Sequence, residues 1–329
     1  MELVLDVEEH PERTQRPTLR ATQRAQQTAA LSLGDVGDVS VIAVSDGTLF
    51  VFASGANSRS QRDGRLLAFD EATQRQLSSW RAGPEPTAMT ISATSAWIAN
   101  GPDAGPSTDA NAVLELSRAD GHVMHRYHIA SPTGIEYRDG AAWIVSGGVG
   151  NIPVTVERLT VGTKETVARW PRNITQSGGL LGPSTNCGDD LFVAITDDYL
   201  HLFDFNLPAH RVRRVGSIHV SGVATMSCLR NELLIAVANV DNGGLYVVNP
   251  SDGRVSKRFG RAFPRAVAAF GSAAVMVQDD PRSPAVLEYV GQAGTVEGAR
   301  LLPVGIAGVV TASRRGIWVL IGREVLLVD

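Results

Sequence analysis

Short apolar runs, each opened by one or two turn residues, recur along the chain at nearly even spacing. Every run places an aromatic or aliphatic anchor inside a short segment with the character of a β-strand. The seven runs are 46–54, 94–101, 139–147, 188–196, 230–239, 271–279 and 314–322. Their anchors, which lie 41 to 48 residues apart, are Phe50, Trp97, Trp143, Leu191, Leu234, Val275 and Trp318. A repeat of about 40–50 residues is typical of the four-stranded blade of a β-propeller.

The residues between successive anchors predict three further strands in each repeat. A second apolar run follows each anchor, as at 65–70, 112–117 and 244–249, and a turn and a more polar strand come next. A turn that carries Gly or Pro then leads into the inner strand of the following repeat. No segment shows a clear helical period, because Gly and Pro interrupt the chain too often. The sequence therefore predicts an all-β, seven-bladed β-propeller with four-stranded antiparallel blades.

The last repeat ends after its third strand, and the N-terminal part of the chain is predicted to supply the missing outer strand. Residues 21–34 share the letters ATQR with residues 72–83, which contain the turn and outer strand of the first repeat. We therefore expect residues 24–33 to complete the last blade and close the ring, which removes two exposed sheet edges. Residues 21–329 are predicted to form one propeller domain, preceded by an N-terminal tail at 1–20.

Aromatic-anchored strands and proline turns give the repeats a recognisable form. The strands read AWIAN at 96–100 and AAWIVS at 141–146, and P-x-[GA]-[IMV] turns begin at Pro86, Pro132 and Pro264. This form resembles the seven-bladed bacterial propellers of the YVTN-repeat and virginiamycin B lyase-like type. The resemblance implies the architecture, because the shared motifs are structural.

The resemblance spans roughly residues 34–329 and allows one functional comparison. In the lyase-like propellers, a His in a P-H-A-I turn and a Glu after a W-F-T strand are the reactive groups. The matching positions in this chain hold Arg265, in FPRAV, and Gln278, in VMVQ. Neither side chain is a good proton acceptor at pH 7. We therefore expect this position to bind an anionic or carbonyl group without lyase turnover.

Composition and charge narrow the classes of partner. The net charge of −4 and the pI of about 6.0 give no support for binding to nucleic acid or to an anionic membrane surface. Hydrophobic residues make up 43% of the chain and charged residues 19%, which excludes a disordered protein. The sequence lacks an apolar stretch of about 18 residues and a secretory signal pattern. We expect a soluble, cytoplasmic monomer.

Motifs for cofactors, metals and nucleophilic catalysis are absent from the sequence. It contains no HExxH, CxxC, GxSxG or GxxxxGK pattern, and its acidic loops lack the D-x-[DN]-x-[DN]-G spacing of a calcium loop. We therefore expect no cofactor and no metal site. Cys187 and Cys228, near the ends of inner strands in neighbouring repeats, are predicted to be two reduced, buried thiols.

The most informative functional feature is a set of long, polar loops that follow the anchor strands. In a propeller these loops emerge on one face together with the turns that lead into the inner strands, and loops on a rigid scaffold often carry function. The predicted ligand-binding residues on this face are Asn100, Asp103, Ser146, Asp197, Asn239, Asp241, Arg265, Gln278 and Asp279. We expect this face, around the central channel, to bind a small molecule or a protein or peptide. The alternative is an enzyme, a lyase or hydrolase with its active site at the channel mouth.

Overall fold

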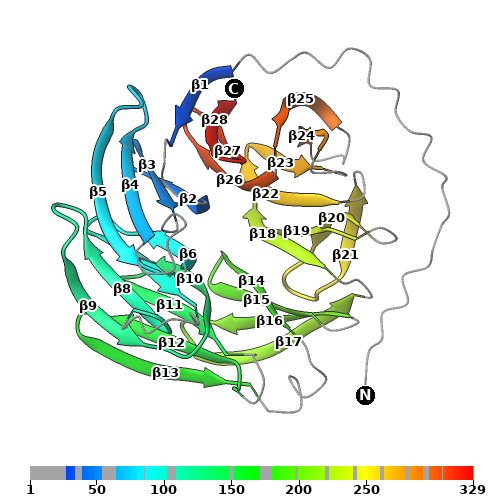
Figure 1. Cartoon of the computed structure of the whole chain (residues 1–329). Helices are drawn as coiled ribbons and strands as arrows, with labels where there is room; N and C mark the ends of the chain where they lie inside the picture. The colour runs from blue at the N-terminus through cyan, green and yellow to red at the C-terminus, as the bar shows by residue number, and fades with distance from the viewer. Residues whose placement is uncertain are drawn as a thin grey trace.

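The structure is a computed structural model that describes residues 27–33, 39–53, 64–84, 86–101, 109–147, 152–170, 180–196, 199–218, 222–239, 243–259, 263–278, 282–291, 296–305 and 307–328. The described strands form seven four-stranded antiparallel sheets that stand around a common axis (Figure 1). The first strand of each sheet contacts the first strand of the next sheet around the whole ring. The predicted all-β, seven-bladed propeller is confirmed.

Each blade runs from an inner strand at the axis to an outer strand at the rim. Blade 1 holds β2 (Val39–Ser45), β3 (Thr48–Ala53), β4 (Gly64–Asp70) and β5 (Gln76–Gly83). Blade 2 holds β6 (Pro86–Ile91), β7 (Ser95–Asn100), β8 (Ala112–Ser117) and β9 (Val123–His128). Blade 3 holds β10 (Pro132–Arg138), β11 (Ala141–Ser146), β12 (Thr155–Thr160) and β13 (Thr163–Arg169). Blade 4 holds β14 (Leu180–Cys187), β15 (Asp190–Thr196), β16 (Leu200–Asn206) and β17 (Arg211–Ile218).

The remaining blades follow the same order. Blade 5 holds β18 (Val223–Leu229), β19 (Glu232–Val237), β20 (Gly244–Val248) and β21 (Val255–Phe259). Blade 6 holds β22 (Pro264–Phe270), β23 (Ser272–Val277), β24 (Pro284–Val290) and β25 (Val296–Val304). Blade 7 holds β26 (Ala307–Ser313), β27 (Gly316–Ile321), β28 (Glu324–Val328) and β1 (Gln27–Ser32).

Strand β1 closes the ring, as the sequence predicts. It pairs antiparallel with β28, with Ser32 opposite Glu324 and Gln27 opposite Val328. Leu31 and Leu33 are buried in a cluster that also contains Trp318 of blade 7 and residues of blade 1. The N-terminal segment therefore joins the last blade to the first.

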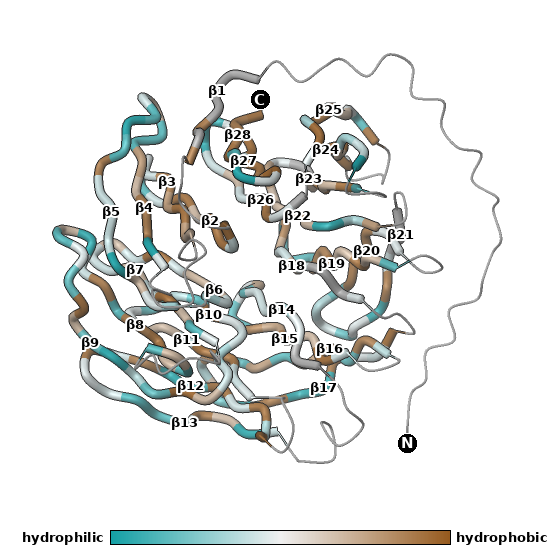
Figure 2. Tube along the Cα trace, viewed as in Figure 1, coloured by the Kyte–Doolittle hydropathy of each residue, from teal (hydrophilic) through white to brown (hydrophobic). Residues whose placement is uncertain are grey.

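The side-chain pattern of each strand follows from its place in the blade. The second and third strands are buried on both faces because a neighbouring blade covers each face, so β7 and β8 are buried at every position. The outer strands are more polar, and β13 exposes four residues in succession. Figure 2 shows this change, with the outer strand β13 more hydrophilic than the third strand β4. Hydrophobic burial is thus concentrated between blades.

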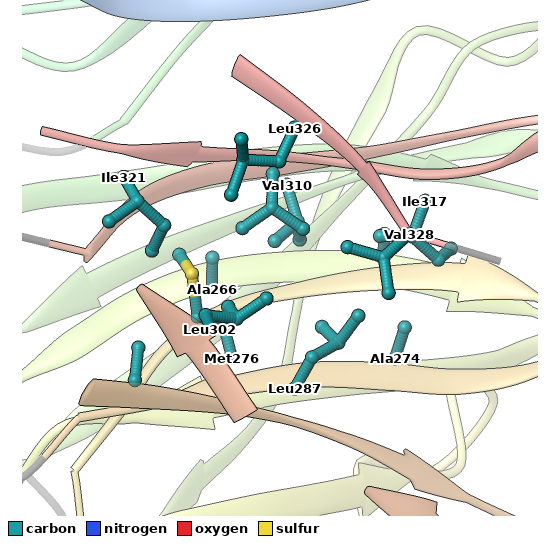
Figure 3. Packing of buried hydrophobic residues seen from close by; sticks show 13 residues of the cluster. Ala266, Ala274, Met276, Leu287, Leu302, Val310, Ile317, Ile321, Leu326 and Val328 are labelled. Atoms are coloured by element: carbon teal, nitrogen blue, oxygen red, sulfur yellow. The ribbon is translucent and has the colours of Figure 1, made fainter. Parts of the chain in front are cut away.

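Clusters of apolar side chains fill the spaces between blades. Between blades 6 and 7, Met276 and Leu287 pack against Ile317, Val319 and other residues (Figure 3). Each interface of this kind removes apolar surface from water, and this burial stabilises the fold by about 25 cal/mol per Å² of buried area.

The anchor assignment holds at five blades and is wrong by one residue at two. Trp97, Trp143 and Trp318 are buried and pack toward the following blade. Leu191 and Val275 instead pack toward the preceding blade. Their neighbours Phe192 and Met276 occupy the anchor side. A shift of one residue in a strand reverses the face that a side chain occupies.

The prediction of two reduced thiols is wrong. Cys187, at the end of β14, and Cys228, on β18, form a disulfide with their Cα atoms 5.3 Å apart. The two inner strands are neighbours in the ring, so the stacking of blades 4 and 5 brings the two cysteines within disulfide distance. No helix in the described part of the chain is long and apolar enough to cross a membrane.

Candidate functional site

The nine predicted ligand-binding residues divide into three groups. Asp103, Asp197, Asp241 and Asp279 lie outside the described residues, as does most of each long loop that follows an anchor strand. Their role in binding therefore stays a prediction.

Asn100, Ser146 and Gln278 lie at the ends of anchor strands and are buried. The Asn100 amide donates a hydrogen bond to the Ala82 carbonyl (3.3 Å), and the Ser146 hydroxyl bonds the Thr155 hydroxyl (2.8 Å). These partners are parts of the blades themselves. The burial places these side chains in the framework that holds the loop bases.

Gln278 ties together three parts of blade 6. Its amide donates to the carbonyl oxygens of Ser283 (3.0 Å) and Gly305 (2.6 Å), and its backbone N–H donates to Phe263 O (3.3 Å). The backbone bond thus ties Gln278 to the turn that carries Arg265. Asn239, after β19, is half-buried and also has a partner in the structure.

A β-bulge interrupts the pairing near the start of every inner strand. The bulged residues are Ser40, Thr87, Thr133, Gly182 with Pro183, Ala224, Arg265, and Gly308 with Val309. A bulge redirects a side chain away from the regular face of the strand. Because the bulges recur at the loop-bearing end of each inner strand, they surround the axis at one level.

Arg265 is the one charged residue in this ring of bulges. It is half-buried, whereas Pro264 and Ala266 on either side are buried. The guanidinium forms no ion pair with any residue that the structure describes. An arginine presents a planar set of N–H donors that suits a carboxylate or phosphate. The position therefore offers, beside the axis, a cation without a counter-ion among the described residues.

The residue two positions before Arg265 has an unusual backbone. Phe263 has φ of 63°, in the left-handed region, and its carbonyl accepts a bond from Gln278 N–H. Ser131 in blade 3 and Gly222 in blade 5 occupy the matching position, with the same φ sign and the same backbone bond. Glycine has no penalty there, whereas a bulky side chain costs about 1–2 kcal/mol. Blade 6 thus holds an aromatic residue two positions before Arg265 at a cost in backbone energy.

A second group near the axis escaped the sequence reasoning. Glu136 on β10 and Asn186 on β14 lie on neighbouring inner strands, with Glu136 Oε2 3.5 Å from Asn186 Nδ2. Asn186 Oδ1 is buried and accepts no hydrogen bond from a described residue. Burial raises the pKa of Glu136 to about 7. The sequence does contain a signal for Glu136, because a charged residue in the middle of a predicted inner strand is unusual.

Substituting Glu136→Gln is expected to change how stability depends on pH. The folded state keeps the Glu136 proton up to about pH 7, whereas the unfolded chain releases it near its ordinary pKa of about 4.3. Stability of the wild type should therefore fall as pH rises through this window, by up to about 3 kcal/mol, and the variant should not show this loss. Urea unfolding at pH 4.5 and pH 8 measures the difference.

The exposed Glu232 provides the control for this experiment. Glu232→Gln should shift stability little at either pH. Equal pH profiles for the wild type and Glu136→Gln would contradict the burial of the Glu136 carboxyl.

The described residues contain no group of three or more His, Cys, Asp and Glu side chains able to hold a metal. Glu136 has an amide as its hydrogen-bonding neighbour, whereas an acid–base pair requires a second titratable group within reach. Nothing described at the axis therefore supports the enzyme alternative.

Comparison with known proteins identifies the architecture. No family model matches the chain, and no curated protein matches it significantly. The chain is similar in structure to the Cps50 (Swd1) β-propeller domain of Myceliophteria thermophila, with a TM-score of 0.67 and 12% identity over 91% of this chain and 99% of that one. At these identities the similarity shows the propeller fold alone.

Two further solved structures are similar over most of their length. The WD40 repeats of RRP9 give a TM-score of 0.63 at 13% identity, over 94% of this chain and 100% of that one. BamB from Moraxella catarrhalis gives 0.59 at 14% identity, over 92% of this chain and 99% of that one. The chain thus belongs to the structural class of β-propellers.

Proposed function

We propose that this protein is a non-catalytic binding propeller that holds an anionic group of a protein or peptide partner at the Phe263–Arg265 turn of blade 6. The observation that carries the proposal is the Arg265 guanidinium, which is half-buried on an inner-strand bulge and has no described ion-pair partner. A buried or half-buried cation without a counter-ion is costly unless a ligand supplies one.

The surroundings of Arg265 suit a side chain or chain terminus that carries both charge and apolar surface. Phe263, two residues before Arg265, is half-buried and adds apolar surface to the turn. The backbone N–H of Gln278 donates to the Phe263 carbonyl and so ties the turn to the end of β23. A pre-organised arginine loses less conformational entropy when it binds a carboxylate.

Protein partners are favoured over a small-molecule substrate for two reasons. The ring of bulges otherwise carries uncharged side chains such as Ser40 and Thr87, which do not supply the convergent charged groups that would fix a small molecule. Arg265 and Gln278 replace the His and Glu of the lyase-like propellers that the sequence resembles. We therefore place the chain with propellers of that form as a binding member without lyase turnover.

We propose a monomer in an oxidising compartment, in place of the predicted cytoplasmic location. The Cys187–Cys228 disulfide argues for an oxidising compartment, because cytoplasmic thiols are kept reduced. A closed ring needs no second copy to cover a sheet edge at blade 7, which favours a monomer.

Replacing Arg265 by Ala is expected to remove the partner. The amount of partner captured by the variant should be lower than that captured by the wild type by a factor of about ten or more, because a charge-assisted hydrogen bond contributes about 1.5–3 kcal/mol. The measurement is affinity capture from a lysate of the source organism, with quantitative mass spectrometry of proteins and small molecules. Arg169→Ala, at an exposed arginine of β13, is the matched control. Recovery of the same molecules on all three baits would contradict the proposal.

A further inference from the structure

The outer strand of blade 4 concentrates positive charge. Strand β17 carries Arg211, Arg213 and Arg214 and no acidic residue, and residues 211–214 are all exposed. The other outer strands carry at most two lysine or arginine residues each, and β13 and β25 also contain a glutamate. This concentration stands out in a chain with a net charge of −4.

One of the three arginines holds the blades together. Arg213 Nε donates to Asp204 Oδ2 (2.9 Å), and its Nη1 donates to the Ser251 carbonyl of blade 5 (2.9 Å). Asp204 is buried, and its hydrogen bond raises the pKa of Arg213. Arg213 is therefore satisfied within the protein.

The other two arginines keep their capacity for an outside anion. Arg214 donates to the Ser217 hydroxyl and to the His201 ring (3.0 Å), and it has no carboxylate partner among the described residues. Arg211 has no ion-pair partner among the described residues. Val212 between them is 37% exposed, which adds apolar surface to the strand.

The backbone of β17 offers a second kind of contact. β17 is the last strand of its sheet, so one edge pairs with β16 and the other edge pairs with no described strand. An unpaired edge presents a row of backbone N–H and C=O groups that an extended peptide can match. Side chains alternate between the two faces, so Arg211 and Arg213 share one face and Val212 and Arg214 the other.

We propose that β17 is a docking strand for an extended acidic peptide, which adds to the edge of blade 4 and places carboxylates against Arg211 and Arg214. This surface lies at the rim and is independent of the Arg265 turn. A peptide satisfies both the charge and the unpaired backbone edge, whereas a nucleic acid satisfies the charge alone. The peptide is therefore the occupant that the strand favours.

Binding of a labelled test peptide examines the proposal. The probe is a fluorescent, end-capped, valine-rich peptide with two glutamates three residues apart, which face opposite sides of an extended strand as Arg211 and Arg214 do. It is titrated into the full chain and followed by anisotropy. The double variant Arg211→Glu/Arg214→Glu should bind it at least about tenfold more weakly. Arg169→Glu, on the neighbouring outer strand β13, should bind it as the wild type does. Arg213 stays unchanged, so the contact between blades 4 and 5 is retained.

A second probe separates strand addition from simple charge attraction. The same peptide with N-methyl groups on alternate residues keeps its charge and loses backbone donors, so it should bind at least about tenfold more weakly. Equal binding of both peptides, equal loss in Arg169→Glu, or tighter binding of a single-stranded oligothymidine would overturn the proposal. Loss of the Arg265-dependent partner leaves this result unaffected, because the two surfaces are tested by different variants.

Discussion

Removal of residues 1–34 is expected to lower the unfolding free energy by several kcal/mol. The deletion takes away β1, leaves the edge of β28 unpaired, and removes Leu31 and Leu33 from the cluster around Trp318. Burial of one leucine side chain contributes about 1.5–3 kcal/mol, and the lost strand pairing adds to this. Urea unfolding, followed by the fluorescence of the buried tryptophans, measures the change.

A shorter deletion provides the control for the ring closure. Removing residues 1–18 leaves β1 and both leucines in place, so its unfolding midpoint should match that of the full chain. Equal midpoints for the two deletions would mean that β1 does not hold the ring closed.

Loss of the Cys187–Cys228 disulfide is expected to cost about 4 kcal/mol. The bond spans 41 residues, and the loss of loop-closure entropy in the unfolded chain gives this magnitude. The double variant Cys187→Ala/Cys228→Ala should therefore unfold at a much lower urea concentration than the oxidised wild type. A reductant should lower the wild-type midpoint and leave that of the variant unchanged. Two free thiols in the unreduced, purified protein would refute the bond.

The fold was predictable because its signals repeat. Turns and anchors recur seven times, so an error in one repeat is corrected by the others. The ATQR match also located the closing strand, predicted at 24–33 and observed at Gln27–Ser32. The N-terminal tail and the exact domain limits stay predictions, since residues 1–26 lie outside the described residues.

It was harder to predict which neighbouring blade each side chain of a strand packs against. The runs around Leu191 and Val275 are apolar at nearly every position, because both faces of a middle strand are buried. Without alternation, the sequence carries no signal for which face meets the next blade. The Cys187–Cys228 contact was missed for a related reason: it depends on how two blades stack, and the 41-residue separation gives no hint of that.

The candidate site was predictable only where a residue is unlike its counterparts in the other repeats. Arg265 stands at a position that elsewhere holds small side chains, and the sequence comparison drew attention to it. Asn100 and Gln278 looked accessible because polar loops follow them. In the structure, the side-chain amides of Asn100 and Gln278 donate hydrogen bonds to the carbonyls of Ala82 and Gly305. Such three-dimensional partners leave no trace in the local sequence.

Site-specific photo-crosslinking from Phe263 tests the proposed binding site most directly. A benzophenone side chain in place of Phe263 lies two residues from Arg265, and the same group at Phe270 samples the opposite end of β22. Phe270 is 37% exposed and Phe263 is half-buried, so a probe at either position reaches the surface. We predict that the captured partner forms an adduct with the probe at 263 and not at 270, and that Arg265→Ala abolishes the adduct. An adduct at 270 with none at 263 would contradict binding at this turn.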